Sequence, residues 1–99
     1  MASPYRVVYP LAIRNALRTL VSRAALRGMR QQVLATVKEI DAQLRIDPIG
    51  FGDPRYSLPA AKLRVFIRVC PPVVVDYAVH LEKALVFVGQ FRPYPLDAF

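Results

Sequence analysis

The sequence predicts an α+β fold in which two helices pack on one face of a small, mostly antiparallel, four-stranded sheet. Three observations predict it. The elements follow in the order β-α-α-β-β-β, the last three strands have connections short enough to require antiparallel neighbours, and 99 residues leave no room for a second core. Residues 1–99 are therefore predicted to form a single domain.

The N-terminal half predicts one strand followed by two helices. Residues 5–9 are rich in aromatic and β-branched side chains, and Pro10 ends this strand. Apolar residues then recur at helical spacing over residues 13–24, and Gly28 is the expected break between the helices. The apolar stripe of the second helix steps by three or four positions through Leu26, Met29, Val33, Val37, Ile40 and Leu44. This helix is expected to end before Pro48.

The C-terminal half predicts a loop and three strands. Prolines and glycines are frequent over residues 47–60, which are therefore expected to be a loop. The predicted strands cover residues 62–69, 73–79 and 84–91. Residues 80–83 form the expected hairpin turn between the last two strands. Their more polar faces carry Asp76 with His80, and Gln90 with Arg92.

The first of these three strands has the most informative pattern. Because strand side chains alternate between faces, four of its residues are predicted to share an exposed face: Lys62, Arg64, Phe66 and Arg68. The alternate set is predicted to face the core: Leu63, Val65, Ile67 and Val69. Three cations with an interleaved aromatic ring suit an anionic ligand, with phosphate bound by the cations and a base stacked on the ring. The alternative is a solvated sheet face beside a charged strand.

The charge of the chain points to an acidic partner. The net charge is +7, and residues 1–38 contain seven basic side chains and no carboxylate. Nucleic acid, an anionic membrane surface and an acidic protein are all compatible with this charge. Arg14 and Arg18 lie on the polar side of the first predicted helix, where they are either a solvated face or a nucleic-acid contact.

Several classes of protein are disfavoured. The single cysteine, Cys70, excludes an internal disulfide and a cysteine-based metal cage, and it fits a reducing cytoplasm. The acidic residues have no recognisable metal-ligand spacing, so no metal or other cofactor is predicted. No apolar run is long enough to span a membrane, and no membrane association is predicted.

The chain resembles the RelE/ParE superfamily of toxins from bacterial type II toxin–antitoxin modules. The resemblance extends over residues 5–94 and rests on length, element order and local sequence. In the N-terminal half, the local signals are the opening strand at residues 5–9, the helix end at residues 44–48 and the Phe-Gly-Asp-Pro segment at 51–54. In the C-terminal half, residues 75–79 are similar to the family's R-V-x-Y-x-V strand, and Arg-Pro-Tyr follows at 92–94.

The resemblance implies a function and a set of site residues. The ribonuclease branch of the superfamily cuts mRNA on the ribosome without a metal, using the 2′-hydroxyl of the RNA as the attacking group. By position, Arg64, Arg92 and Tyr94 would then be catalytic. The residues implied or predicted to bind RNA are Lys62, Phe66, Arg68, Arg14 and Arg18. A small acidic antitoxin is the implied protein partner.

Two other functions stay open. The chain lacks a terminal His-Tyr pair, and its only histidine, His80, falls in the predicted hairpin turn, so no general base is evident. Another branch of the superfamily inhibits DNA gyrase and has no nuclease activity. A non-toxic member of the fold that only binds RNA or the ribosome is the third possibility.

Overall fold

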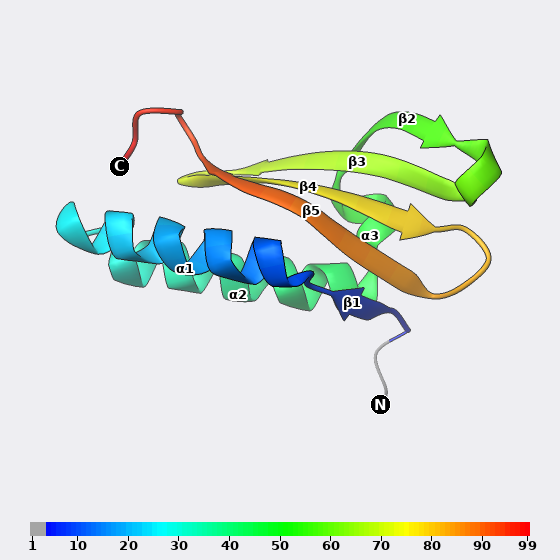
Figure 1. Cartoon of the computed structure of the whole chain (residues 1–99), viewed down its shortest axis with the longest axis horizontal. Helices are drawn as coiled ribbons and strands as arrows, with labels where there is room; N and C mark the ends of the chain where they lie inside the picture. The colour runs from blue at the N-terminus through cyan, green and yellow to red at the C-terminus, as the bar shows by residue number, and fades with distance from the viewer. Residues whose placement is uncertain (1–3) are drawn as a thin grey trace.

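The computed structural model describes residues 4–99, which form a helical layer packed on one face of a mixed sheet (Figure 1). The layer contains α1 (Leu11–Leu26) and α2 (Arg30–Ile46). The chain turns between them at Gly28, whose φ of 69° favours a residue without a side chain. The predicted helical pair and its break are confirmed. A one-turn helix, α3 (Pro48–Phe51), follows within the predicted loop.

In the described part of the chain, the sheet has five strands, not the four that were predicted. The strands are β1 (Arg6–Val8), β2 (Asp53–Leu58), β3 (Leu63–Cys70), β4 (Val73–His80) and β5 (Leu85–Pro93). Their order in the sheet is β1-β5-β4-β3-β2. β1 is parallel to β5 and the other neighbours are antiparallel, so the prediction of a mostly antiparallel sheet is confirmed.

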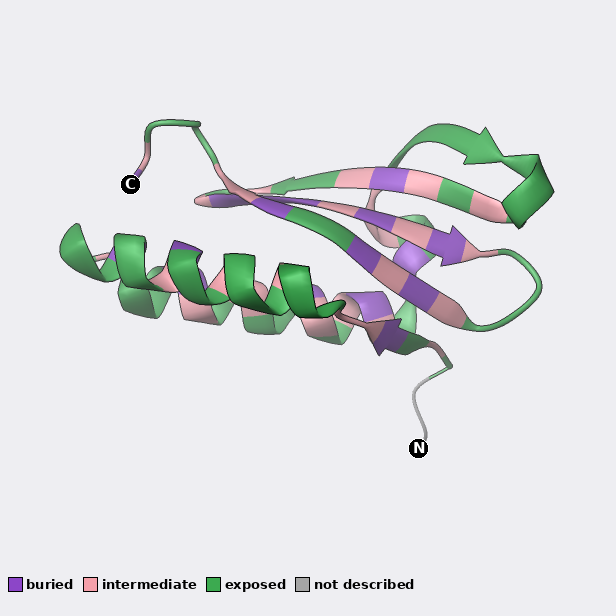
Figure 2. Ribbon diagram, viewed as in Figure 1, coloured by how far each residue is buried: buried purple, intermediate pink, exposed green. Residues whose placement is uncertain are grey.

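Strand β2 is the element that the sequence pattern missed. It lies at the edge of the sheet and all of its residues are exposed, so it has no alternation of buried and exposed side chains to detect (Figure 2). Pro54 is tolerated because an edge strand needs only one row of backbone hydrogen bonds. The short 3₁₀ turn at Pro59–Ala61 then returns the chain into β3.

The prediction of which β3 residues face the core is wrong. Phe66 lies opposite Tyr77 of β4, and their stacked rings, with centroids 5.4 Å apart, are both 1% exposed on the side covered by the helices. Val65 lies on the other face and is only half-buried, and Val69 is 40% exposed. The helices cover the middle of the sheet more fully than β3, so the cations beside Phe66 reach solvent from the core side. The face of β3 that carries more apolar residues is therefore not the face that packs on the core.

The hydrophobic core lies between the sheet and the helices. Val33 and Ile40 of α2 are fully buried, as are Val75 of β4 and Val86 of β5. Phe99 folds back into this core and is 5% exposed, while the Arg23 guanidinium donates a 2.9 Å hydrogen bond to the backbone oxygen of Phe99. The opposite face of the sheet has no helix over it in the described part of the chain (Figure 1).

A polar cluster joins the segment before α1 to α2. The Tyr9 hydroxyl donates a 2.5 Å hydrogen bond to Asp41, and Arg45 donates through Nε at 2.9 Å and through a terminal nitrogen at 3.2 Å. Partial burial works to raise the pKa of Asp41, but the bonds from Arg45 and Tyr9 outweigh it and hold the pKa below the ordinary 3.8.

We expect this cluster to make the fold sensitive to acid. Because the pKa of Asp41 is lower in the folded state, the unfolded state binds more protons below about pH 4, and stability is lost as the pH falls further. Asp41→Asn is expected to flatten this loss in urea denaturation measured at a series of pH values. The exposed Asp97→Asn is the matched control, and equal pH slopes for the two variants would mean that the Asp41 cluster contributes nothing.

Candidate functional site

The face of the sheet away from the helices, here called the open face, carries an ordered set of side chains. One row crosses the sheet through Tyr56, Val65, Ala78 and Phe87, which are neighbours in consecutive strand pairs. The next row pairs Asp76 with Gln90. The open face therefore has an apolar and aromatic area beside a polar one.

Asp76 and Arg92 form the charged part of the open face. One terminal nitrogen of Arg92 lies 3.3 Å from both carboxylate oxygens of Asp76, and their side chains are 38% and 20% exposed respectively. These distances are longer than those of a strong charged hydrogen bond, so an anionic ligand can compete for the guanidinium. The Nε of Arg92 is buried and finds no hydrogen-bond partner among the described residues.

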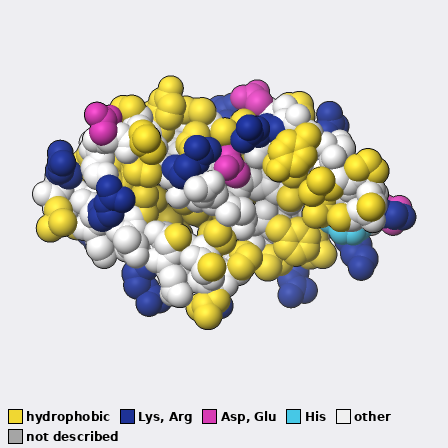
Figure 3. Space-filling view, turned by 45° about the horizontal axis from the view of Figure 1, so that its top comes forward, with side chains coloured by type: hydrophobic (Ala, Val, Ile, Leu, Met, Phe, Trp, Pro, Cys, Tyr) yellow, Lys and Arg dark blue, Asp and Glu magenta, His cyan; other side chains and the backbone are white. Residues whose placement is uncertain are grey.

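A shallow hollow of about 320 Å³ lies beside this pair and extends across the open face from β2 to β5. Arg55 and Tyr56 line it from the edge strand, and Asp76, Phe87 and Gln90 line it from the central strands. The space-filling view from the sheet side shows basic side chains next to an acidic one near the middle, with an apolar area beside them (Figure 3). We call Arg55, Tyr56, Asp76, Gln90 and Arg92 the sheet-face site.

The structure places the predicted β3 residues on the other face of the sheet. Arg64 lies opposite Val79, and its guanidinium is 5.7 Å from the centre of the Phe66 ring. Arg68 lies 5.0 Å from the centre of the Phe51 ring. Both are exposed, but they are separated from Arg92 by the thickness of the sheet. Phe66 is buried against Tyr77, so it presents no free ring face for a base.

The remaining predicted residues lie at three further places. Lys62 is in the turn before β3, not in the strand, and its ammonium group contacts Glu82 at 2.6 Å. Tyr94 is 44% exposed and lines a cavity with residues of α2 and of the turn between β3 and β4. Arg14 and Arg18 line a groove between α1 and α2. The predicted set is therefore not gathered in one site.

Sequence reasoning found part of the sheet-face site. It placed Asp76, Gln90 and Arg92 on the polar faces of their strands, and the polar faces of β4 and β5 do coincide. The polar face of β3, with Arg64 and Arg68, lies on the opposite side of the sheet. It missed Arg55 and Tyr56, because residues 53–58 were expected to be a loop. A detectable signal was the length of that segment, which is sufficient for an edge strand antiparallel to β3.

His80 has a structural role in the hairpin. It is the last residue of β4, and its Nδ1 accepts hydrogen bonds from the backbone N–H groups of Glu82 and Lys83 at 3.2 and 3.1 Å. Among residues 4–99, no group of three or more potential ligand side chains is placed to hold a metal ion. No helix in the same residues is long and apolar enough to cross a membrane.

Comparison with known proteins identifies the fold. No protein-family model matches the sequence, and no curated protein matches it. Among solved structures, the chain matches one from the archaeal RelE–RelB complex of Pyrococcus horikoshii OT3, with a TM-score of 0.62 and 16% sequence identity. The match covers 97% of this chain and 99% of the other. The chain therefore has a RelE-like fold, as its sequence resemblance implied.

Proposed function

We propose that the protein is the toxin of a toxin–antitoxin pair and that it cleaves ribosome-bound mRNA at the sheet-face site. The observation that carries this proposal is the pairing of Arg92 with Asp76 beside a hollow lined by Tyr56 and Phe87. A cation, a carboxylate and an aromatic surface are what a metal-independent RNA cleavage site needs. The RelE-like fold of the chain supports the same function.

The proposed reaction uses the 2′-hydroxyl of the RNA as nucleophile. Arg92 and Arg55 bind the phosphate, and a neighbouring base stacks on the ring of Tyr56. Asp76 takes the proton of the 2′-hydroxyl, the 2′-oxygen bonds to phosphorus, and the bond from phosphorus to the 5′-oxygen breaks. The leaving 5′-oxygen takes a proton from water, and the proton that Asp76 holds neutralises the resulting hydroxide and restores the carboxylate. Arg92 offsets the negative charge that develops on the phosphate oxygens. The products are a 2′,3′-cyclic phosphate and a 5′-hydroxyl end.

The other predicted residues enter the proposal as secondary contacts. Arg64 and Arg68 form an exposed basic strip on the far side of β3, and a ribosomal RNA backbone following the sheet edge is a suitable ligand for it. Tyr94 stays a prediction as a residue that orients the RNA. These roles are separate from the chemistry, which the proposal assigns to Arg92 and Asp76.

The test is cleavage of mRNA on programmed ribosomes. We expect primer extension to detect cuts in the decoding site within the purified wild-type reaction, and fewer cuts in free mRNA because it is not held in a fixed geometry. Asp76→Asn is expected to slow cleavage about 10²–10⁴-fold if it removes the proton acceptor. Intact mRNA on ribosomes with well-folded protein would rule out the ribonuclease function.

One observation favours a second candidate function, inhibition of DNA gyrase. Arg64, Arg92 and Tyr94, which the superfamily resemblance implies as a catalytic set, lie on three separate surfaces. A member of the fold that acts by binding alone does not need them together. Gyrase supercoiling assays distinguish the two functions: unchanged supercoiling at excess protein would remove this candidate.

A further inference from the structure

Two β-bulges lie on either side of the hollow in the sheet-face site. In β2, Arg55 is an extra residue without a partner in the register with β3. In β5, Gly89 is an extra residue without a partner in the register with β4. Both extra residues line the hollow. Because bulges redirect side chains and are frequent beside binding sites, the pair indicates that the sheet is shaped for a ligand here.

The glycine at position 89 is not required by the fold. Its φ lies outside the left-handed region, and a Cβ atom added to it would meet the backbone oxygen of Asp76 at 3.5 Å, an ordinary contact. Glycine inside a strand lowers stability, and it often marks a place where a ligand approaches the backbone closely. The absence of a side chain at Gly89 therefore serves to keep the hollow open.

The side chains around the hollow can recognise a flat polar ring. Gln90 is exposed, so its amide offers a ligand both a donor and an acceptor. Opposite it on β4 lies Asp76, whose carboxylate only accepts hydrogen bonds when ionised. The rings of Tyr56 and Phe87 line the same hollow and supply an aromatic surface. An aromatic base with a donor next to an acceptor on one edge matches this arrangement.

We propose that the hollow is a base pocket that selects adenine next to the cleaved phosphate. This inference rests on the function proposed above, because it takes RNA as the ligand of the sheet-face site. The adenine ring stacks on Tyr56 and covers Gly89, while the Gln90 amide accepts from N6 and donates to N7. A hollow of about 320 Å³ is at the small end of the range for ligand sites, which suits a single nucleoside.

The other bases fit the pocket less well. The matching edge of guanine carries two acceptors, O6 and N7, which would face the carboxylate of Asp76 and leave the carbonyl oxygen of Gln90 unpaired. Uracil and cytosine have a single ring and cover less of the aromatic surface. Cytosine has a donor at N4 but no neighbouring ring acceptor on that edge, and uracil has only an acceptor there. Adenine satisfies both groups of the Gln90 amide.

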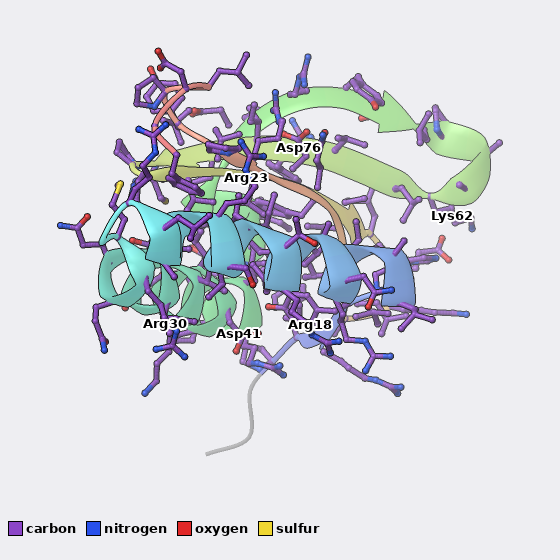
Figure 4. The ribbon with its side chains drawn as sticks, turned by 60° about the vertical axis from the view of Figure 1, so that its left-hand side comes forward. Arg18, Arg23, Arg30, Asp41, Lys62 and Asp76 are labelled. Carbon is purple, nitrogen blue, oxygen red and sulfur yellow. The ribbon has the colours of Figure 1, made fainter. Side chains whose placement is uncertain are left out.

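The pocket is separate from the basic helices. Figure 4 shows Asp76 on the sheet side of the molecule and Arg18, Arg30 and Asp41 on the helical side. The cations of α1 and α2 therefore do not reach the pocket, and they do not distinguish one base from another. Base selection then depends on the residues of the sheet alone.

Oligonucleotides that cannot be cut test the pocket directly. The probes are fluorescein-labelled oligodeoxynucleotides of five units, with uracil at four positions and a variable base at the centre. They have no 2′-hydroxyl, so the proposed reaction cannot occur. By fluorescence anisotropy, we expect a central adenine to bind about tenfold more tightly than guanine, cytosine or uracil. Replacing adenine by 7-deazaadenine, which lacks the N7 acceptor, is expected to weaken binding about fivefold.

Variants of the protein locate the base. Gln90→Ala is expected to bind adenine and 7-deazaadenine equally, whereas Gln31→Ala, the same change on the exposed side of α2, keeps the difference. Gly89→Leu fills the hollow and is expected to weaken adenine binding about tenfold. Ser57→Leu is its matched control, because Ser57 is an exposed residue of β2 paired with Arg64. Gly89→Ala, which makes only an ordinary contact, keeps the test valid if the leucine variant unfolds.

Several outcomes would overturn the proposal. Equal binding of the four bases, or no measurable binding by well-folded protein, would mean that the hollow selects no base. A preference for adenine that survives both Gln90→Ala and Gly89→Leu would place base recognition outside the hollow. Tighter binding of guanine would assign recognition to the carboxylate of Asp76, which can accept from the N1 and N2 hydrogens of guanine, and would reject Gln90 as the selecting residue.

Cleavage on ribosomes separates this inference from the proposed nuclease. The substrates are four mRNAs that differ only in one base of the codon in the decoding site. We expect the wild-type protein to cut the adenine codon fastest, and Gln90→Ala to cut all four at equal rates. Selective binding of adenine without any cleavage would support the pocket and reject the nuclease. Cleavage by the wild-type protein at equal rates for all four bases would support the nuclease and reject the pocket.

Discussion

Replacing Arg92 by alanine is expected to reduce mRNA cleavage about 10²–10³-fold, the usual loss when a donor that stabilises transition-state charge is removed. The same replacement at Arg64 is expected to have a small effect. The superfamily resemblance implies a catalytic role for both residues, but only Arg92 lies on the open face beside Asp76 and the hollow. Arg64 lies on the opposite face beside Phe66.

The loss should come from chemistry and not from unfolding. Arg92 is more than a third exposed, and its ion pair with Asp76 is long, so the pair adds little to stability. Arg92→Lys keeps a charge but loses the planar guanidinium, and we expect it to recover only part of the activity. Primer extension on ribosomes gives the cleavage rates, and thermal unfolding gives the stabilities of the same variants.

The comparison of Arg92 and Arg64 decides between two sites. A large loss with Arg92→Ala alone would support the sheet-face site. Equal losses with both variants would contradict it, because one bound phosphate cannot contact both faces of the sheet. A large loss with Arg64→Ala alone would move the site to the strip that Arg64 forms with Arg68 along β3.

The fold was predictable wherever apolar residues recur with a clear helical or strand period. The stripes of α1 and α2, and the buried residues of β4 and β5, have one covered face each, so the apolar positions identify it. The buried face of β3 could not be identified in this way because both of its faces are partly covered. On one face Phe66 stacks on Tyr77, and on the other Val65 lies in the row between Tyr56 and Ala78.

The site was less predictable than the fold because it depends on which strands are neighbours. Asp76 and Gln90 are 14 positions apart in sequence, and their pairing follows from the hairpin register. Arg55 joins them through an edge strand with no buried residue to mark it. Charge alone pointed correctly to a basic N-terminal region, but only the packing of α1 on α2 places its cations around a groove.

Replacing Tyr77 is expected to have the largest effect on stability. Its ring is 1% exposed, stacks on Phe66, and its hydroxyl donates a 2.5 Å hydrogen bond to the backbone oxygen of Pro48. Burial raises the pKa of this hydroxyl well above its usual value, so it stays a donor at any pH at which the protein would be studied. The side chain thus joins β4 to α3.

Two substitutions separate the ring from its hydroxyl. Tyr77→Ala is expected to cost about 3–5 kcal/mol, because it leaves a cavity where a large ring was packed. Tyr77→Phe keeps the ring but leaves the oxygen of Pro48 without its donor, at a cost of about 1–3 kcal/mol. Urea denaturation measures both, with Tyr94→Phe as the control because Tyr94 is 44% exposed.

Gly52 gives an independent check on the same contact. A side chain at this position would collide with the Tyr77 hydroxyl, so Gly52→Ala is expected to displace that hydroxyl and to destabilise the wild-type protein. In the Tyr77→Phe background the obstructing oxygen is absent, and the cost of Gly52→Ala is expected to be smaller. A double-mutant cycle measures this coupling directly. Purely additive effects would mean that a side chain at position 52 does not displace the Tyr77 hydroxyl, and the cost of Tyr77→Phe alone would then be the measure of the bond to Pro48.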